Sequence, residues 1–163
     1  MQRIQASAVY QVEGIAEDPR CAERARRLLA SIDGPAPVVV SDAELNEIAG
    51  TLRPTWRRHG MTRPVSTTVI LNRFRFDDEE TEGRRREAFP NLTHYKLNGY
   101  GGYDWRNSGA PAWREQTGLV CFPAYQIHTV VGCGFRCAYC NLGHLANLML
   151  NLEEYAERLD ERM

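Results

Sequence analysis

The sequence predicts an α/β fold in which short apolar strands alternate with amphipathic helices. Strand-like runs followed by helix-start signals fill the first fifty residues, and a strand, a cysteine-rich loop and a helix close the chain. The chain has 163 residues, of which 43% are hydrophobic and 25% charged, and this balance is typical of a globular protein with a real core.

Composition also narrows the class of function. The formal net charge of −1 provides neither an overall basic field for nucleic acid nor an acidic tail for a basic partner. No apolar run approaches the roughly 20 residues that a spanning helix needs, and the first residues lack the apolar stretch of a secretory signal. Five cysteines, three of them clustered, favour metal or redox use in a reducing compartment over a disulfide framework. We therefore expect a cytoplasmic protein without membrane contact.

The first predicted helix follows a short strand within residues 7–15. Asp18 followed by Pro19 is typical of a helix start, with a capping acceptor before a proline in the first turn. Cys21 falls on an apolar stripe at helical spacing, so we expect it to face the core rather than to bind a metal.

A second strand and helix are expected directly afterwards. The run Val38–Val40 predicts a short buried strand. Ser41 and Glu44 then have the spacing of a capping box and predict a helix that ends near Gly50.

The middle of the chain predicts one further strand, at residues 67–71. The acidic run 77–80 and the basic run 84–86 are interpreted as a solvated loop or helix face rather than a nucleic-acid contact. The glycine- and aromatic-rich stretch 99–111 lacks the order of a phosphate loop or a dinucleotide fingerprint, and we expect it to be a structured connection.

The last predicted strand is the alternating run 125–131, which leads into Gly132 and the cysteines. An extended apolar piece at 148–150 and a helix follow, with Asn151 as its cap and Glu154 at the capping-box position. The expected buried stripe of this helix is Leu152, Tyr155, Ala156 and Leu159. Strand, cysteine loop and helix predict a βα unit with its chemistry at the end of the strand, where parallel α/β folds place active sites.

Cys133, Cys137 and Cys140 form a C-x3-C-x2-C run, the most informative feature of the sequence. Three thiolates at this spacing can converge on one metal centre and leave one coordination position without a nearby cysteine. Iron–sulfur clusters are held by cysteine thiolates, and a four-iron cluster with three such ligands has one iron free to bind another molecule. The glycines around the run allow the backbone to turn tightly.

Tetrahedral zinc is the alternative to a cluster. His144 would then be the fourth ligand, with Cys121 a more distant candidate. Zinc sites usually pair two C-x2-C knuckles, and this chain has no second pair, so the cluster is favoured.

C-x3-C-x-aromatic-C directly after a strand resembles the signature of the radical S-adenosylmethionine superfamily. The resemblance implies that Cys133, Cys137 and Cys140 ligate a [4Fe-4S] cluster whose free iron chelates S-adenosyl-L-methionine. In that superfamily, an electron from a flavodoxin- or ferredoxin-like donor cleaves the sulfonium to a 5'-deoxyadenosyl radical, which abstracts hydrogen from the substrate. Tyr139 would lie against the adenine, or alternatively pack the loop on the barrel.

A closer likeness is to the spore photoproduct lyase branch, loosely over residues 1–50 and well over 119–163. The element Cys121-Phe122-Pro123 before the strand and the Asn-capped helix after it are similar to that branch. Its members reverse a thymine photodimer, so DNA is one candidate substrate. The chain departs from the lyases at Asn141, where they have tyrosine, and in having no cysteine after Cys140 to donate hydrogen.

Three ranges are therefore predicted: a small N-terminal α/β domain at 1–60, a connecting region at 61–118, and the start of a radical S-adenosylmethionine barrel at 119–163. Only 23 residues follow Cys140 (163 minus 140), fewer than one further βαβ element of about 30 residues. We therefore expect a truncated partial (β/α) barrel with no identifiable catalytic residue, inactive alone and with the stripe of its last helix exposed. The alternatives are a zinc-stabilised binding module and a non-catalytic remnant.

Overall fold

The computed structural model of the chain describes residues 3–52, 67–102, 104–106, 112, 115–116, 118, 124–126, 128–132 and 145–160. Within this part, four α-helices pack on a mostly parallel sheet, which confirms the predicted α/β class. The helices are α1 (Pro19–Leu29), α2 (Asp42–Thr51), α3 (Glu79–Ala88) and α5 (Leu152–Asp160), with a 3-10 helix at Pro90–Lys96. None of the described helices has the length and apolar character needed to cross a membrane.

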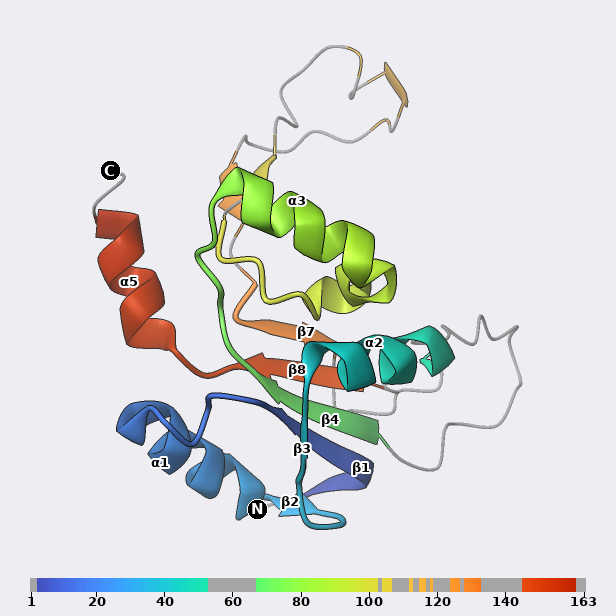
Figure 1. Cartoon of the computed structure of the whole chain (residues 1–163), viewed down its shortest axis with the longest axis vertical. Coiled ribbons are helices and arrows are strands. Elements are labelled where there is room, and N and C mark those ends of the chain that lie inside the picture. Colours follow the sequence, from blue (N-terminus) through green and yellow to red (C-terminus); the bar gives the residue numbers. More distant parts are fainter. Residues whose placement is uncertain are drawn as a thin grey trace.

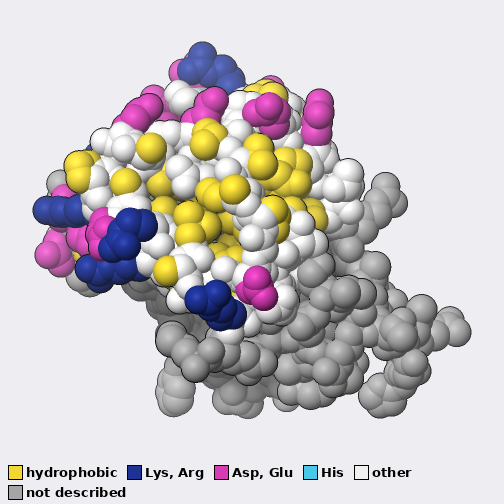
Figure 2. All heavy atoms as spheres, turned by 90° about the horizontal axis from the view of Figure 1, so that it is seen from below, with side chains coloured by type: hydrophobic (Ala, Val, Ile, Leu, Met, Phe, Trp, Pro, Cys, Tyr) yellow, Lys and Arg dark blue, Asp and Glu magenta, His cyan; other side chains and the backbone are white. Residues whose placement is uncertain are grey.

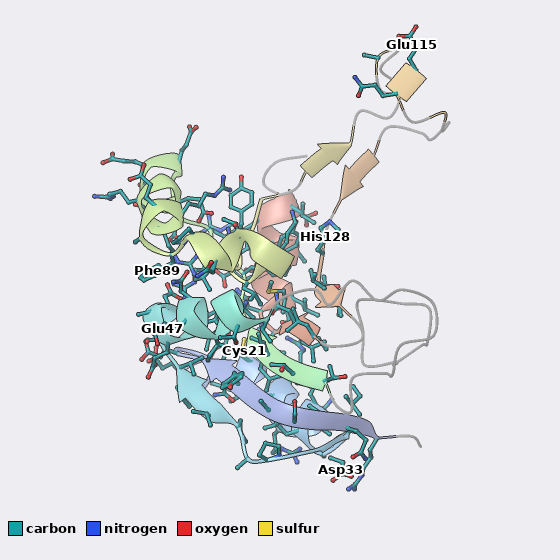
Figure 3. All side chains as sticks on the ribbon, turned by 90° about the vertical axis from the view of Figure 1, so that its right-hand side faces the viewer. Cys21, Asp33, Glu47, Phe89, Glu115 and His128 are labelled. Atoms are coloured by element: carbon teal, nitrogen blue, oxygen red, sulfur yellow. The ribbon has the colours of Figure 1, made fainter. Side chains whose placement is uncertain are left out.

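The central sheet has the strand order β2-β1-β4-β8-β7, and Figure 1 shows β1, β4, β8 and β7 side by side. Strands β1 (Ile4–Val12), β4 (Thr67–Asn72) and β8 (Leu145–Met149) run parallel. β2 (Ile32–Asp33) and β3 (Val38–Val40) also pair with β1 in parallel, whereas β7 (Val130–Gly132) is antiparallel to β8. A separate antiparallel pair, β5 (Asp104–Arg106) and β6 (Ala124–Gln126), stands outside this sheet (Figure 3).

The core is centred on β4, whose six residues are all buried. Successive side chains of a strand point to opposite faces, so the sheet is covered on both faces at this strand. Helices α1 and α2 contribute to the same apolar cluster through Cys21, Ala25, Leu45 and Ala49. Cys21 is 3% exposed and belongs to this cluster, as its helical spacing predicted.

Both N-terminal helices begin as predicted. The Asp18 carboxylate accepts hydrogen bonds from the backbone N–H groups of Arg20 (2.8 Å) and Cys21 (3.3 Å). At α2 the Ser41 hydroxyl accepts from the Glu44 N–H, and the Glu44 carboxylate accepts from the Ser41 N–H (2.8 Å), which is the predicted capping box. These bonds satisfy N–H groups that have no partner within the helix.

The expected burial of β3 is wrong for two of its three residues. Val38 and Val39 are 56% and 59% exposed, and Val40 alone is buried. The reason is position, because β3 lies at the sheet edge and pairs only with β1 among the described strands. Figure 2 views the molecule from below relative to Figure 1 and shows hydrophobic side chains gathered on that face.

The charged run after β4 contains helix α3, which Asp78 caps by accepting from the Thr81 N–H (2.7 Å). It is only partly the solvated face that was predicted, because Glu82 is buried and Arg85 half-buried, while Arg84 is exposed. The expected connection after it is structured over the described residues 99–102. There Gly101 donates to the Arg75 carbonyl (2.8 Å), and Arg75 donates to the Gly99 carbonyl (2.7 Å).

Of the apolar piece expected at 148–150, Leu148 and Met149 belong to strand β8 and Leu150 follows it. Asn151 does not close the expected capping box. Its side-chain oxygen accepts from the Phe74 N–H (2.6 Å), and its amide donates to the Phe74 carbonyl (2.9 Å) and to Glu154 (2.7 Å). The side chain therefore fixes the segment after β4, and it contacts its own helix through the Glu154 carboxylate rather than by capping a backbone N–H.

The apolar stripe of α5 is better covered than expected. Tyr155 is 4% exposed and packs on Phe74 and Phe76, with its ring centroid 4.2 Å and 6.0 Å from theirs. Leu152 and Leu159 are half-buried in the same cluster, and Ala156 is exposed. The strands of the central sheet come from all three predicted ranges, and the domain boundaries themselves stay a prediction.

We predict that Asn151→Ala lowers the free energy of unfolding by about 3 kcal/mol, because it leaves a buried N–H and carbonyl of Phe74 without partners. The measurement is the urea midpoint. The matched control is Asn46→Ala, which removes the hydrogen bond that its half-buried side-chain oxygen accepts from the Asn91 N–H (3.0 Å) and is expected to cost about 1 kcal/mol. Equal losses in the two variants would contradict the role of Asn151.

The Cys21 thiol makes the stability of the fold sensitive to high pH. Burial raises its pKa to about 11, and its Sγ–H donates to the Asp18 carboxylate (3.4 Å). An unfolded thiol ionises near pH 8.5, so the contribution is full below that pH and is lost as the pH rises toward 11.

We therefore predict that the wild-type chain loses about 2 kcal/mol more unfolding free energy than Cys21→Ala between about pH 8 and pH 10.5. Urea unfolding under reducing conditions at both pH values measures this difference. The other four cysteines are common to both proteins. Identical pH dependence of the two would show that the Cys21 thiol ionises normally in the folded state.

Candidate functional site

The predicted metal and cofactor residues lie outside the described part of the chain. They are Cys133, Cys137, Cys140 and Tyr139, together with the zinc alternatives His144 and Cys121 and the departure at Asn141. Their roles therefore stay predictions. Among the described residues, no group of three or more His, Cys, Asp or Glu side chains is placed to hold a metal ion.

The structure does describe both ends of the cysteine segment, residues 133–144. Gly132, at the end of β7, pairs with Ala146 near the start of β8. Its φ of 91° lies in the left-handed region, and a Cβ there would collide with the Leu145 carbonyl oxygen. Only glycine fits this position, where the two strands close the segment on itself.

Because β7 is antiparallel to β8, the cysteine segment joins the sheet at a different edge from the one predicted. The prediction was a βα unit with the cysteines at the edge where parallel strands end. Strand β8 lies between the cysteine segment and α5, and β7 is antiparallel to it. The segment therefore leaves and re-enters the sheet where β1, β4 and β8 begin. Hydrophobic alternation detects a strand but not its direction, which explains the difference.

A cleft of about 520 Å³ lies at the opposite edge, where β1, β3 and β4 end. Crevices beyond the carboxyl ends of parallel strands are the usual ligand sites of open α/β sheets. The lining residues are Glu13, Gly14, Glu17, Val40, Ser41, Asp42, Ala43, Arg73, Arg75 and Phe89. Phe89, one of them, lies between α2 and the layer of α3 in Figure 3.

Asp42 is the central carboxylate of the cleft wall. It accepts hydrogen bonds from Arg75 (2.6 Å) and from Nε of Arg85 (2.8 Å), whose side chain is 9% exposed. Arg85 also donates to the Asn98 carbonyl. One carboxylate therefore bridges two guanidinium groups from different segments and joins α2 to α3.

The charged form of Arg75 is destabilised by its surroundings. Burial lowers its pKa from the ordinary range, and the positive charge of Arg85 lowers it further, against the opposing effect of Asp42. Its Nε is buried without a hydrogen-bond partner among the described residues. The cleft wall therefore has more donor capacity than the described side chains use.

Arg73 enters the same cleft directly after β4. Its N–H donates to the Asn72 side-chain oxygen (2.8 Å), and the Asn72 amide donates to the Leu97 carbonyl (2.9 Å), which fixes the chain at this point. The guanidinium lies over Gly14, with Nη1 only 2.6 Å from where a Cβ would stand, and Gly14 has a φ of 83°. No ion pair or hydrogen bond of this guanidinium is found within the described part of the chain.

Sequence reasoning did not identify any residue of this cleft as functional. A usable signal was present, because the cleft residues directly follow three of the predicted strands, at 13–17, 41–43 and 73–75. Parallel strands align these positions at one edge. Recognising the cleft required knowing that β1, β3 and β4 are parallel, which periodicity alone does not reveal.

We predict that Asp42→Asn lowers the free energy of unfolding by about 3 kcal/mol, because two partly buried guanidinium groups lose their shared counter-charge. The urea midpoint measures this loss. The control is Glu80→Gln, which weakens an exposed pair with Arg84 at 3.9 Å and is expected to change stability by no more than about 0.5 kcal/mol. A loss at Asp42 as small as the control's would contradict its central role.

Comparison with known proteins adds no assignment: no family model, curated protein or solved structure matches this chain.

Proposed function

We propose that Cys133, Cys137 and Cys140 bind a [4Fe-4S] cluster in a radical S-adenosylmethionine enzyme. The observation that carries the proposal is the C-x3-C-x2-C spacing, with an aromatic residue directly before the last cysteine. Thiolates are the ligands that iron–sulfur clusters require, and three of them leave one iron open.

The surrounding fold supports such a site in one respect. The pairing of β7 with β8 brings the two ends of segment 133–144 together, so that all three cysteines belong to one closed loop. A loop whose ends are already joined loses less entropy when its ligands converge on a metal centre. Gly132 permits this closure through its left-handed backbone.

The chain's own residues would bind and orient the cofactors. The three cysteines would bind as thiolates, so assembly of the site releases their protons. Tyr139 would lie against the adenine of S-adenosyl-L-methionine. When bound, the cluster and S-adenosyl-L-methionine would supply the 5'-deoxyadenosyl radical that removes hydrogen from a substrate. A flavodoxin- or ferredoxin-like protein would supply the electron.

The proposal also includes a partial (β/α) barrel and a candidate substrate. A (β/α) barrel has parallel strands, and the cysteine segment here joins antiparallel β7 and β8, so the barrel would differ at its first strand. DNA is the candidate substrate suggested by the likeness to spore photoproduct lyases. Asn141 in place of the lyase tyrosine requires a different route for hydrogen return.

We predict that anaerobic reconstitution with iron and sulfide loads about four of each per chain and produces the visible absorption of a [4Fe-4S] cluster. Replacing any of Cys133, Cys137 or Cys140 by alanine should abolish a stable cluster. The matched controls are Cys21→Ala, at a buried core cysteine, and His144→Ala, and both should load normally. The electron paramagnetic resonance spectrum of the reduced cluster should change when S-adenosyl-L-methionine is added.

Two results would overturn the proposal at different levels. Stoichiometric zinc without sulfide, or loss of metal in His144→Ala with full retention in Cys137→Ala, would overturn the cluster. Zinc that is lost in both variants would support the zinc-stabilised binding module. A cluster whose spectrum does not respond to S-adenosyl-L-methionine would retain the iron–sulfur site and remove the radical chemistry.

A further inference from the structure

The cleft at the ends of β1, β3 and β4 has the size and composition of a ligand site separate from the cysteines. Its volume of about 520 Å³ lies in the range of small-molecule pockets, about 300–1,000 Å³. The strand ends build its walls and the pairing of β1 with β3 and β4 fixes their positions. A backbone bond from the Glu13 N–H to the Val40 carbonyl (3.1 Å) holds two of these ends together.

The cleft is lined by three carboxylates, on Glu13, Glu17 and Asp42, and by the two guanidinium groups of Arg73 and Arg75. Asp42 is already shared by Arg75 and Arg85, which leaves the Arg73 guanidinium without a carboxylate partner among the described residues. Arg73 and Arg75 lie two residues apart after β4 and both line the cleft. The wall contributed by β4 therefore offers guanidinium donors to an oxyanion.

One hydrogen-bond donor of this wall, Nε of Arg75, is not used by the described residues. The Arg75 Nε finds no acceptor in the described part of the chain, and burial together with neighbouring guanidinium groups lowers the Arg75 pKa. An anion beside Arg73 and Arg75 would offset this repulsion. Guanidinium groups bind phosphate oxygens in pairs through charge-assisted hydrogen bonds, and these are stronger than neutral ones.

The part of the cleft that follows β1 carries hydrogen-bond acceptors. Glu13 and Glu17 follow β1 and flank Gly14, and a Glu17 carboxylate oxygen is 3.9 Å from the point above Gly14 that Arg73 also approaches. Neither carboxylate has an ion pair within 4.0 Å among the described residues. Carboxylates at this edge of α/β sheets accept hydrogen bonds from sugar hydroxyls.

The N-terminus of α2 also lines the cleft but contributes little to anion binding. Its capping box bonds Ser41 and Glu44 to each other, and the acidic Asp42 and Glu44 offset the positive end of the helix dipole. Anion binding therefore depends on the two arginines.

We propose that this cleft binds a small phosphorylated molecule with hydroxyl groups, of the sugar phosphate kind. The phosphate lies against Arg73 and Arg75, and the hydroxyl groups donate to Glu13 and Glu17. The site is independent of the cysteines and of the cluster proposed for them.

The test is titration calorimetry on the full chain at constant ionic strength with four probes: ribose 5-phosphate, inorganic phosphate, ribose and malate. Ribose 5-phosphate should bind more tightly than inorganic phosphate, and ribose alone should not bind measurably. Malate separates carboxylate from phosphate recognition and should bind more weakly than ribose 5-phosphate. Equal or tighter binding of malate would overturn the phosphate assignment.

Variants then locate the site. Arg73→Ala should weaken binding of ribose 5-phosphate about tenfold or more, and Arg73→Lys should retain part of the affinity through its charge. Glu13→Gln should weaken ribose 5-phosphate more than inorganic phosphate. Arg84→Ala, an exposed arginine of α3 outside the cleft, and Cys137→Ala should leave binding unchanged.

Two outcomes count against the proposal. Phosphate binding that is equally strong in Arg73→Ala and wild type would show non-specific attraction to the surface. Absence of binding by all four probes would overturn the proposal, and losses of stability in Arg73→Ala and Glu17→Gln would then assign these two side chains a structural role only.

Discussion

The complete burial of β4 is the constraint on which the rest of the structure depends. All six of its residues are buried, and it pairs in parallel with β1 on one side and β8 on the other. A strand buried on both faces has one favourable register, because a shift of one residue would exchange its two sets of side chains. The ends of the neighbouring strands are therefore fixed relative to each other, and with them the cleft beyond those ends.

Two buried asparagine side chains fix the backbone just beyond the ends of the strands. Asn72 bonds the Leu97 carbonyl and the Arg73 N–H, and Asn151 bonds both backbone groups of Phe74. These buried amides replace the ladder bonds that the backbone loses when it leaves the sheet. Consequently Arg73 projects from a segment that the two amides fix, and Arg75 follows it directly with its N–H bonded to the Gly99 carbonyl. This order favours their preorganisation for an oxyanion.

The sequence predicts local structure well and spatial arrangement poorly. Asp18 and Ser41 mark helix starts through bonds with their own neighbours, so these elements follow from a few residues. The exposure of Val38 and the use of Asn151 by Phe74 depend on strand order and on a contact 77 residues distant in sequence. The cleft was missed for the same reason. The cysteine motif is local in sequence, and this is why it predicts a cofactor even though the described residues do not include it.

The antiparallel direction of β7 separates the two candidate sites. The cysteine segment begins and ends where the parallel strands start, and the cleft lies where they finish. Six residues of β4 span about 20 Å. A small molecule in the cleft is therefore about one strand length from both ends of the cysteine segment. Any influence of one site on the other would have to pass through β4 and β8, whose buried and hydrogen-bonded pairing leaves little room for two arrangements. This rigidity favours two sites with separate ligands over one shared active centre.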